Sequence, residues 1–170
     1  MIEQLGEYLK DNKTVLTKEI MADLNDLGQR EPWHRLPASM DQDHLPDMIA
    51  SLAETALLTF FGEKERTALA WVGVQHGQHR YEIGIAEETL HREYELLRWA
   101  LWRRLKAQAD TTIASESIIR LDSALSFSHG ASLRGYHRRA IEASGDWPAA
   151  MERFLDEWSF PAAMGRAGQH

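Results

Sequence analysis

A chain of 170 residues has the size of one ordinary domain and can bury a continuous core without disulfides or bound metal. Apolar residues make up 44% of it and charged residues 26%, which excludes wholesale disorder. Acidic side chains outnumber basic ones, 26 to 19, and the formal charge of -7 argues against nucleic acid as a partner.

The sequence has no cysteine, which excludes disulfides, thiolate metal ligands and a cysteine nucleophile. Its N-terminal residues include acidic side chains where a signal peptide needs positive charge and then an apolar run. No stretch approaches the roughly 18 uncharged apolar residues that cross a membrane. We therefore expect a cytoplasmic protein that does not associate with membranes.

Two short amphipathic helices are expected at the start of the chain, over residues 2–12 and 14–27, because apolar residues recur there at helical spacing. Gly28 is expected to end the second helix. The stretch 28–43 contains two prolines and breaks the helical pattern. It therefore predicts a connection.

A third helix is expected to carry Pro46 in its first turn and to stop at Gly62. From 64 to 107 the pattern stays helical, as one long helix or as two with a kink near Gly77. The residues of this stretch that are expected to face inward form a seam in which successive positions are three or four residues apart. It comprises Val72, His76, His79, Ile83, Ala86, Leu90, Tyr94, Leu97, Leu101 and Leu105.

A further helix is expected over 115–143 with Gly145 as its stop, and a last helix follows with Pro148 in its first turn. No segment shows the period-two alternation of a half-buried strand. The pattern therefore predicts an all-α fold, a single-domain helical bundle with two long antiparallel helices, for which a globin-like arrangement is one option. The domain is expected to span 1–158, with a frayed tail at 159–170.

Histidine is frequent, with 8 in the chain, and raises the question of a metal site. Glu88 and His91 form a Glu-x-x-His pair, which is one half of a carboxylate-bridged di-iron site. A complete site needs a second such pair within a helix, and the sequence offers none. A mononuclear site built from His76, His79 and His129 is the other metal-binding arrangement considered. Since neither ligand set is complete, we expect no metal and no cofactor.

Polar side chains interrupt or border the apolar stripes of the two long predicted helices. A buried charge costs several kcal/mol unless it is paired, so the grouping indicates an internal ion-pair network or a polar pocket between the helices. Pockets between bundle helices are common ligand sites. The candidate ligand-binding residues are His76, His79, Arg80, Glu93, Tyr94, Arg98, Asp122 and His129.

Three short motifs add a resemblance to this pattern. They are Asp43-His44-Leu45-Pro46, then Gln75-His76-Gly77 with Arg80 and Gly84, then Glu93-Tyr94-Glu95-Leu96-Leu97-Arg98. Over residues 15–147 the chain resembles the N-terminal sensor domain of RsbT co-antagonist protein RsbRD, which is also found fused to histidine kinases and other signalling outputs. The resemblance implies an all-helical sensory module without catalytic residues. Members usually carry an output domain after the sensor, whereas only a short predicted helix and a tail follow Gly145.

We therefore expect a cytoplasmic, non-catalytic sensory or signalling module that binds a small ligand or a protein partner in an inter-helix polar pocket. By analogy with related stressosome sensors, a homodimer is expected. No nucleophile elbow, phosphate-binding loop or helical His-Glu-x-x-His supports catalysis. The alternatives are a metal-dependent helical-bundle enzyme and a globin-like sensor that binds haem or another tetrapyrrole through a core histidine.

Overall fold

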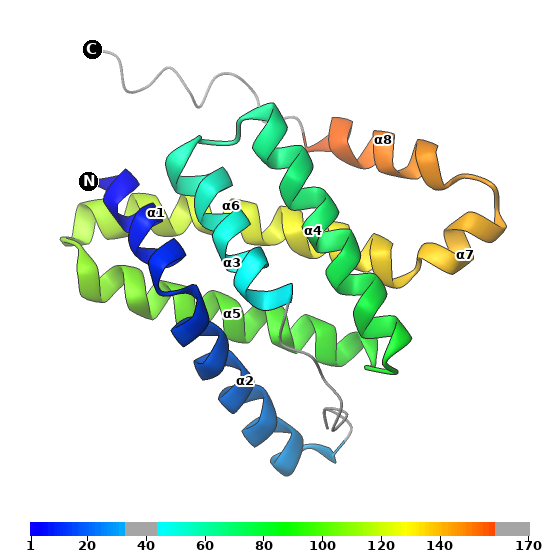
Figure 1. The fold of residues 1–170 in the computed structure, drawn as a ribbon, viewed down its shortest axis with the longest axis horizontal. Helices are drawn as coiled ribbons and strands as arrows, with labels where there is room; N and C mark the ends of the chain where they lie inside the picture. Colours follow the sequence, from blue (N-terminus) through cyan, green and yellow to red (C-terminus); the bar gives the residue numbers. More distant parts are fainter. Residues whose placement is uncertain (33–43, 159–170) are drawn as a thin grey trace.

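The computed structural model describes residues 1–32 and 44–158, and within these ranges every regular element is helical (Figure 1). The elements are α1 (Ile2–Asp11), α2 (Lys13–Arg30), α3 (His44–Ala53), the π-helical turn η2 (Glu54–Leu58), α4 (Glu63–Glu82), α5 (Glu87–Gln108), α6 (Thr111–Tyr136), α7 (Arg138–Ala143) and α8 (Trp147–Glu157). The predicted all-α helical bundle is confirmed. The predicted tail at 159–170 and most of the predicted connection at 28–43 lie outside the described residues.

The first two predicted helices are confirmed, but the predicted end of the second at Gly28 is wrong. Helix α2 continues through Gly28 to Arg30. Gly28 is buried together with Leu24 and Leu27, so packing of this turn outweighs the cost of about 1 kcal/mol for glycine inside a helix. The third helix passes into the π turn η2 and ends there, just before the predicted stop at Gly62.

The prediction of a single long helix over 64–107 is wrong. The alternative of two helices is confirmed, but the break does not lie near Gly77 as predicted. Helices α4 and α5 are separated at 83–86, where Gly84 has a φ of 77° that L residues rarely adopt. Helix α4 continues through Gly77, and the lack of a side chain at this position lets α6 pack closely on α4. A Cβ there would overlap the carbonyl oxygen of Ser132 on α6.

The helix predicted over 115–143 is also divided. Helix α6 ends at Tyr136, and the short α7 begins after His137. The predicted boundary at Gly145 is confirmed, with a φ of 75°, and Pro148 lies in the first turn of α8 as predicted. Whether the long helices form an antiparallel pair of the globin type stays a prediction.

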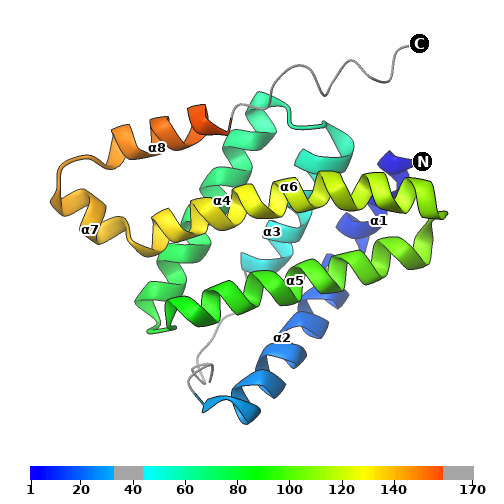
Figure 2. The ribbon, with the colours of Figure 1, turned by 180° about the vertical axis from the view of Figure 1, so that it is seen from behind.

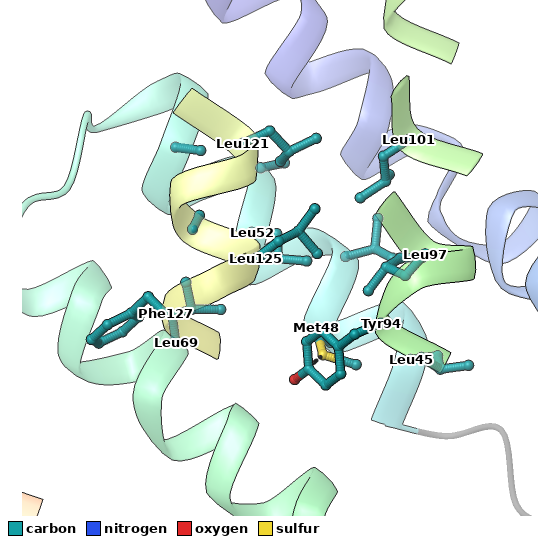
Figure 3. Close-up of a cluster of buried hydrophobic side chains, with 14 of the residues drawn as sticks. Leu45, Met48, Leu52, Leu69, Tyr94, Leu97, Leu101, Leu121, Leu125 and Phe127 are labelled. Atoms are coloured by element: carbon teal, nitrogen blue, oxygen red, sulfur yellow. Dashed lines mark hydrogen bonds between the residues drawn. The ribbon is translucent and has the colours of Figure 1, made fainter. Parts of the chain in front are cut away.

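Helices α1, α2, α4 and α6 pack on α3 around a shared apolar core, with α4 crossing α6 and α5 lying beside α6 (Figures 1 and 2). Figure 3 shows buried side chains of this core that come from α3, α4, α5 and α6. Those labelled are Leu45, Met48, Leu52, Leu69, Tyr94, Leu97, Leu101, Leu121, Leu125 and Phe127, and each is at most 1% exposed. Burying one such aliphatic or aromatic side chain contributes roughly 1.5–3 kcal/mol, so this cluster fixes the helices that carry the polar residues.

The predicted inward seam of residues 72–105 is confirmed on α5 and partly wrong before it. On α5 its members from Leu90 to Leu105 are buried. Ile83 is only half-buried and Ala86 is exposed, because both fall in the turn between α4 and α5. The inward-facing seam is therefore interrupted in the turn between the end of α4 and the start of α5.

Candidate functional site

Three charged or ionisable side chains meet in the interior between α4 and α5. The Arg80 guanidinium donates to Glu93 through Nε at 3.0 Å and through Nη2 at 2.7 Å, and His76 Nε2 lies 3.0 Å from Glu93 Oε2. The side chains of His76 and Arg80 are 0% exposed and that of Glu93 is 3% exposed. Because His76 and Arg80 are four residues apart on one face of α4, both reach the same carboxylate on α5. We call these three residues the buried triad.

The triad holds its charges by mutual compensation. Burial alone would raise the pKa of Glu93, but the neighbouring His76 and Arg80 lower that pKa well below its ordinary value, and the carboxylate is ionised. Burial lowers the pKa of His76 against the opposing effect of Glu93, so its ring is neutral and donates its Nε2–H. The triad is therefore a buried Arg–Glu ion pair with a neutral imidazole hydrogen-bonded to it.

Two buried nitrogens of the triad have no hydrogen-bond partner among the described residues. They are Nδ1 of His76 and Nη1 of Arg80. Buried polar groups in folded proteins are normally hydrogen-bonded, so such atoms need an explanation. With Nε2 donating to Glu93, a neutral His76 offers an acceptor at Nδ1, while Arg80 offers donors at Nη1.

Tyr94, next to Glu93, connects four helices. Its hydroxyl lies 2.6 Å from Ser132 Oγ and 3.0 Å from Ser128 Oγ on α6, and 3.2 Å from Met48 Sδ on α3. Ser132 in turn donates to the carbonyl of Gly73 on α4 at 2.9 Å. Burial raises the pKa of Tyr94, so the phenol stays protonated. This Tyr94 hub ties α3, α4 and α6 to α5 through polar contacts inside the core.

Two more pairs continue the polar residues toward the surface between α5 and α6. His91 Nδ1 lies 2.9 Å from His129 Nε2, and the His129 ring stacks on Tyr94 with centroids 4.5 Å apart. Burial, then the charges of His91 and Arg98, lower the pKa of His129 to about 4. Arg98 donates to Asp122 at 2.5 Å, and this pair is half-exposed, with side-chain exposures of 26% and 42%.

The structure thus brings together most of the eight predicted site residues. His76, Arg80 and Glu93 form the triad, Tyr94 and His129 are stacked, and Arg98 binds Asp122. His79 lies apart from them, with its ring 5.0 Å from that of His44. Sequence reasoning missed Ser128 and Ser132, although two serines four residues apart inside an apolar helical stripe were a readable sign of a polar partner.

The metal-binding arrangements do not assemble in the described residues. The structure pairs His129 with His91, while His76 is bound to Glu93. Glu88 is exposed at the start of α5. No group of three or more histidine, aspartate or glutamate side chains in the described ranges is placed to hold a metal ion.

Two of the clefts that described residues line contain no predicted site residue. One lies where α4, α6 and α7 meet, and the other lies between α2 and α5. The predicted inter-helix polar pocket therefore stays a prediction, while the polar contacts expected around it are present.

The fold and these contacts define the class of the protein as an all-α helical bundle with hydrogen-bonded polar side chains inside its core. No family model matches the chain, and no curated protein or solved structure is detectably similar to it. No helix in the described part of the chain is long and apolar enough to cross a membrane.

Proposed function

We propose that this chain is a cytoplasmic, non-catalytic sensory module that binds a small ligand or a protein partner between α5 and α6 and acts as a homodimer. The proposal is supported by one feature, a set of polar contacts that includes buried pairs and a half-exposed pair between α5 and α6. We call this set the polar layer. It comprises the buried triad, the Tyr94 hub, the His91–His129 pair and the Arg98–Asp122 pair.

The two ends of the polar layer suit different roles. The triad is buried and its two charges are paired, and breaking a buried ion pair is strongly unfavourable, so it acts as a fixed strut between α4 and α5. The Arg98–Asp122 pair is reached by water, and exposed ion pairs contribute only about 0–1 kcal/mol. A ligand or partner can therefore replace Asp122 as the contact of Arg98 at little cost to folding.

The stacked ring of His129 connects the surface residues of the polar layer to the core, so binding at the surface can affect core packing. A partner that contacts Arg98 or the histidine pair displaces His129, which lies against Tyr94. Tyr94 is bonded to Ser132, and Ser132 to the backbone of α4. Binding would then shift the packing of α6 on α4, and small shifts of packed helices are a common form of switching.

The resemblance to the RsbRD sensor domain supports the same assignment. Its motifs supply five members of the polar layer. They are His76, Arg80, Glu93, Tyr94 and Arg98. The signal-transduction and stress-response roles that this resemblance implies belong to the proposal.

A thermal-shift screen with small carboxylic acids and inorganic phosphate tests the proposal, because Arg98 is the accessible cation of the polar layer. We expect at least one probe to raise the melting temperature of the wild-type protein and to lose this effect in Arg98→Ala. Arg103→Ala, which removes an exposed arginine of the same helix, is the matched control and should keep the effect. If no probe binds, or if Arg98→Ala binds as well as wild type, the ligand-binding role is wrong.

A further inference from the structure

A cleft of about 200 Å³ lies where the C-terminal ends of α4 and α6 meet α7, away from the polar layer. Figures 1 and 2 show these helix ends on the same side of the molecule. The cleft is lined by Gln78, Tyr81, Glu82, Gly135, Tyr136, Arg138, Arg139 and Glu142. This volume suits a ligand of roughly the size of one amino acid.

One side of the cleft is an ordered chain of hydrogen bonds. Gln78 donates through Nε2 to Glu82 at 2.9 Å and accepts from Arg138 Nη1 at 2.9 Å. Arg138 also donates to Glu142 at 2.7 Å, and its guanidinium lies over the Trp147 ring. Gln78, Arg138 and Glu142 are thus committed to one another, which fixes α7 against α4.

Two opposite charges remain available in the same cleft. Glu82 accepts one hydrogen bond through Oε1 and forms no ion pair with any described residue. Arg139 has neither a hydrogen bond nor an ion pair within the described ranges, and its guanidinium lies 5.7 Å from the centroid of the Tyr81 ring. The two residues do not pair with each other, although both line the cleft.

Aromatic rings and helix ends complete the cleft. The Tyr81 and Tyr136 rings meet edge to face with centroids 5.4 Å apart, and Tyr136 is held by a 2.7 Å bond from its hydroxyl to the carbonyl of Ile85. The C-terminal end of α4, at Glu82, carries partial negative charge that favours a cation. An ammonium group therefore fits at Glu82 and a carboxylate at Arg139.

We propose that this cleft binds a free amino acid or another small zwitterion of that size. The ammonium group contacts Glu82, the carboxylate contacts Arg139, and the side chain packs on the two tyrosine rings. Charge balance supports a zwitterion over a simple anion or cation, since the four charged lining residues are two glutamates and two arginines. This site is separate from the polar layer and does not depend on the function proposed for it.

The position of the cleft gives binding a structural consequence. Gly135 lines the cleft and also packs on the backbone of α4, where an added Cβ would overlap the carbonyl oxygen of Val74. A ligand beside Gly135 therefore contacts the close crossing of α4 and α6. The NMR signal of the Gly135 amide should therefore shift when the cleft is occupied.

An NMR titration of the ¹⁵N-labelled protein with phenylalanine, leucine and glutamate tests the proposal. At probe concentrations up to about 10 mM, a range that detects weak binding, we expect saturable amide shifts centred on Gly135 for at least one of them. N-acetylphenylalanine lacks the ammonium group and phenethylamine lacks the carboxylate, so each should bind at least about tenfold more weakly than phenylalanine.

Charge-removing variants separate the proposed site from nonspecific binding. Arg139→Gln and Glu82→Gln should each weaken binding at least about tenfold, while Arg92→Gln on α5 should leave it unchanged. All three positions are exposed, so the variants should fold, and far-UV circular dichroism checks this. The proposal is overturned if no amino acid gives saturable shifts, if either analogue binds as well as phenylalanine, or if both cleft variants bind like wild type.

Discussion

The imidazole of His129 lies nearly parallel to the phenol ring of Tyr94, with an interplanar angle of 17° and centroids 4.5 Å apart. Nε2 of His129 is hydrogen-bonded to Nδ1 of His91, and two imidazoles can share this bond only if one of them presents an unprotonated nitrogen. Protonation of both rings turns the bond into a contact between like charges. The charged groups that act on His129 are His91, Arg98, Glu95 and Glu87.

This geometry predicts a loss of stability in acid. The pKa of His129 falls from 6.5 to about 4 on folding, so the folded state binds fewer protons than the unfolded state below pH 6.5. Its contribution is present above pH 6.5 and is lost as the pH falls toward 4. Since His129 is partly exposed, we expect about 1–2 kcal/mol after allowing for solvent screening.

Urea unfolding of wild type and His129→Phe, at pH 7 and at pH 4.5, measures this contribution. The phenylalanine ring keeps the stacking on Tyr94 and cannot be protonated, so the variant should lose less stability in acid than wild type does. Other groups that titrate over this range affect both proteins and cancel in the comparison. Equal losses in the two proteins would show that the histidine pair is not the acid-sensitive contact.

Glycine-to-alanine substitutions should distinguish the steric cost at the α4–α6 crossing from the backbone cost in the turn between α4 and α5. Gly77→Ala places a Cβ against the Ser132 backbone, which cannot rotate away, and we expect a loss of about 1–3 kcal/mol or more. Gly84→Ala meets no atom within 4 Å, but its φ of 77° costs about 1–2 kcal/mol for an L residue. Thermal unfolding should rank Gly77→Ala as the more damaging change, and the reverse ranking would contradict the packing of α6 on α4.

The contrast between these two glycines shows how far the sequence alone could go. Periodicity predicted helical structure on both sides of the break, because each side buries a stripe of apolar residues. It could not place the break, since Gly77 and Gly84 look alike in a helical pattern. Only the approach of α6 explains why Gly77 stays helical, and that approach depends on the tertiary arrangement.

The candidate site was predictable to a similar extent. A charged residue beside a buried stripe must find a partner, which is why Arg80 and Glu93 were recognised from their positions. The partner of His129 depends on how α5 lies along α6, and local spacing carries no information about it. His129 was therefore grouped with His76, whereas the structure pairs it with His91.

Metal analysis tests the enzyme alternative. We expect the purified protein to hold less than about half an equivalent of transition metal per chain, because a stable site needs three or four well-placed ligands. Its visible absorption spectrum tests the tetrapyrrole alternative in the same sample, and we expect no absorption band. Stoichiometric metal retained through mild chelation, or a haem spectrum, would overturn the non-catalytic sensor assignment in favour of one of these alternatives.

Self-association is expected to involve the exposed apolar side chains of α5 and α6. Trp99 is 58% exposed and Ile119 is 67% exposed, and tryptophan is a frequent anchor of protein interfaces. Sedimentation at about 100 µM should show a dimer, and Trp99→Gln should shift it toward monomer. Trp71→Gln, at an exposed tryptophan of α4, is the control and should leave the dimer intact. A strict monomer for wild type would contradict the homodimer.

The polar layer has a fixed end at the buried triad and an accessible end at the Arg98–Asp122 pair, and variants at the two ends should differ in stability. Arg80→Ala leaves the Glu93 carboxylate buried without a cationic partner, so the free energy of unfolding should fall by about 3–5 kcal/mol. Leu97→Ala, the core control, should lose about 2–5 kcal/mol. Arg98→Ala breaks a half-exposed pair and should lose about 1 kcal/mol or less.

Denaturant unfolding of these variants, beside the double variant Arg80→Met with Glu93→Leu, tests whether only the triad is structural or whether the whole polar layer is. Replacing both charges by apolar groups of similar size removes the unpaired carboxylate, so the double variant should be more stable than Arg80→Ala alone. That result, together with a near-wild-type Arg98→Ala, supports a fixed triad and a binding-competent surface pair. If Arg98→Ala instead loses as much stability as Leu97→Ala, the whole polar layer is scaffolding, and the sensory role loses the contacts on which it rests.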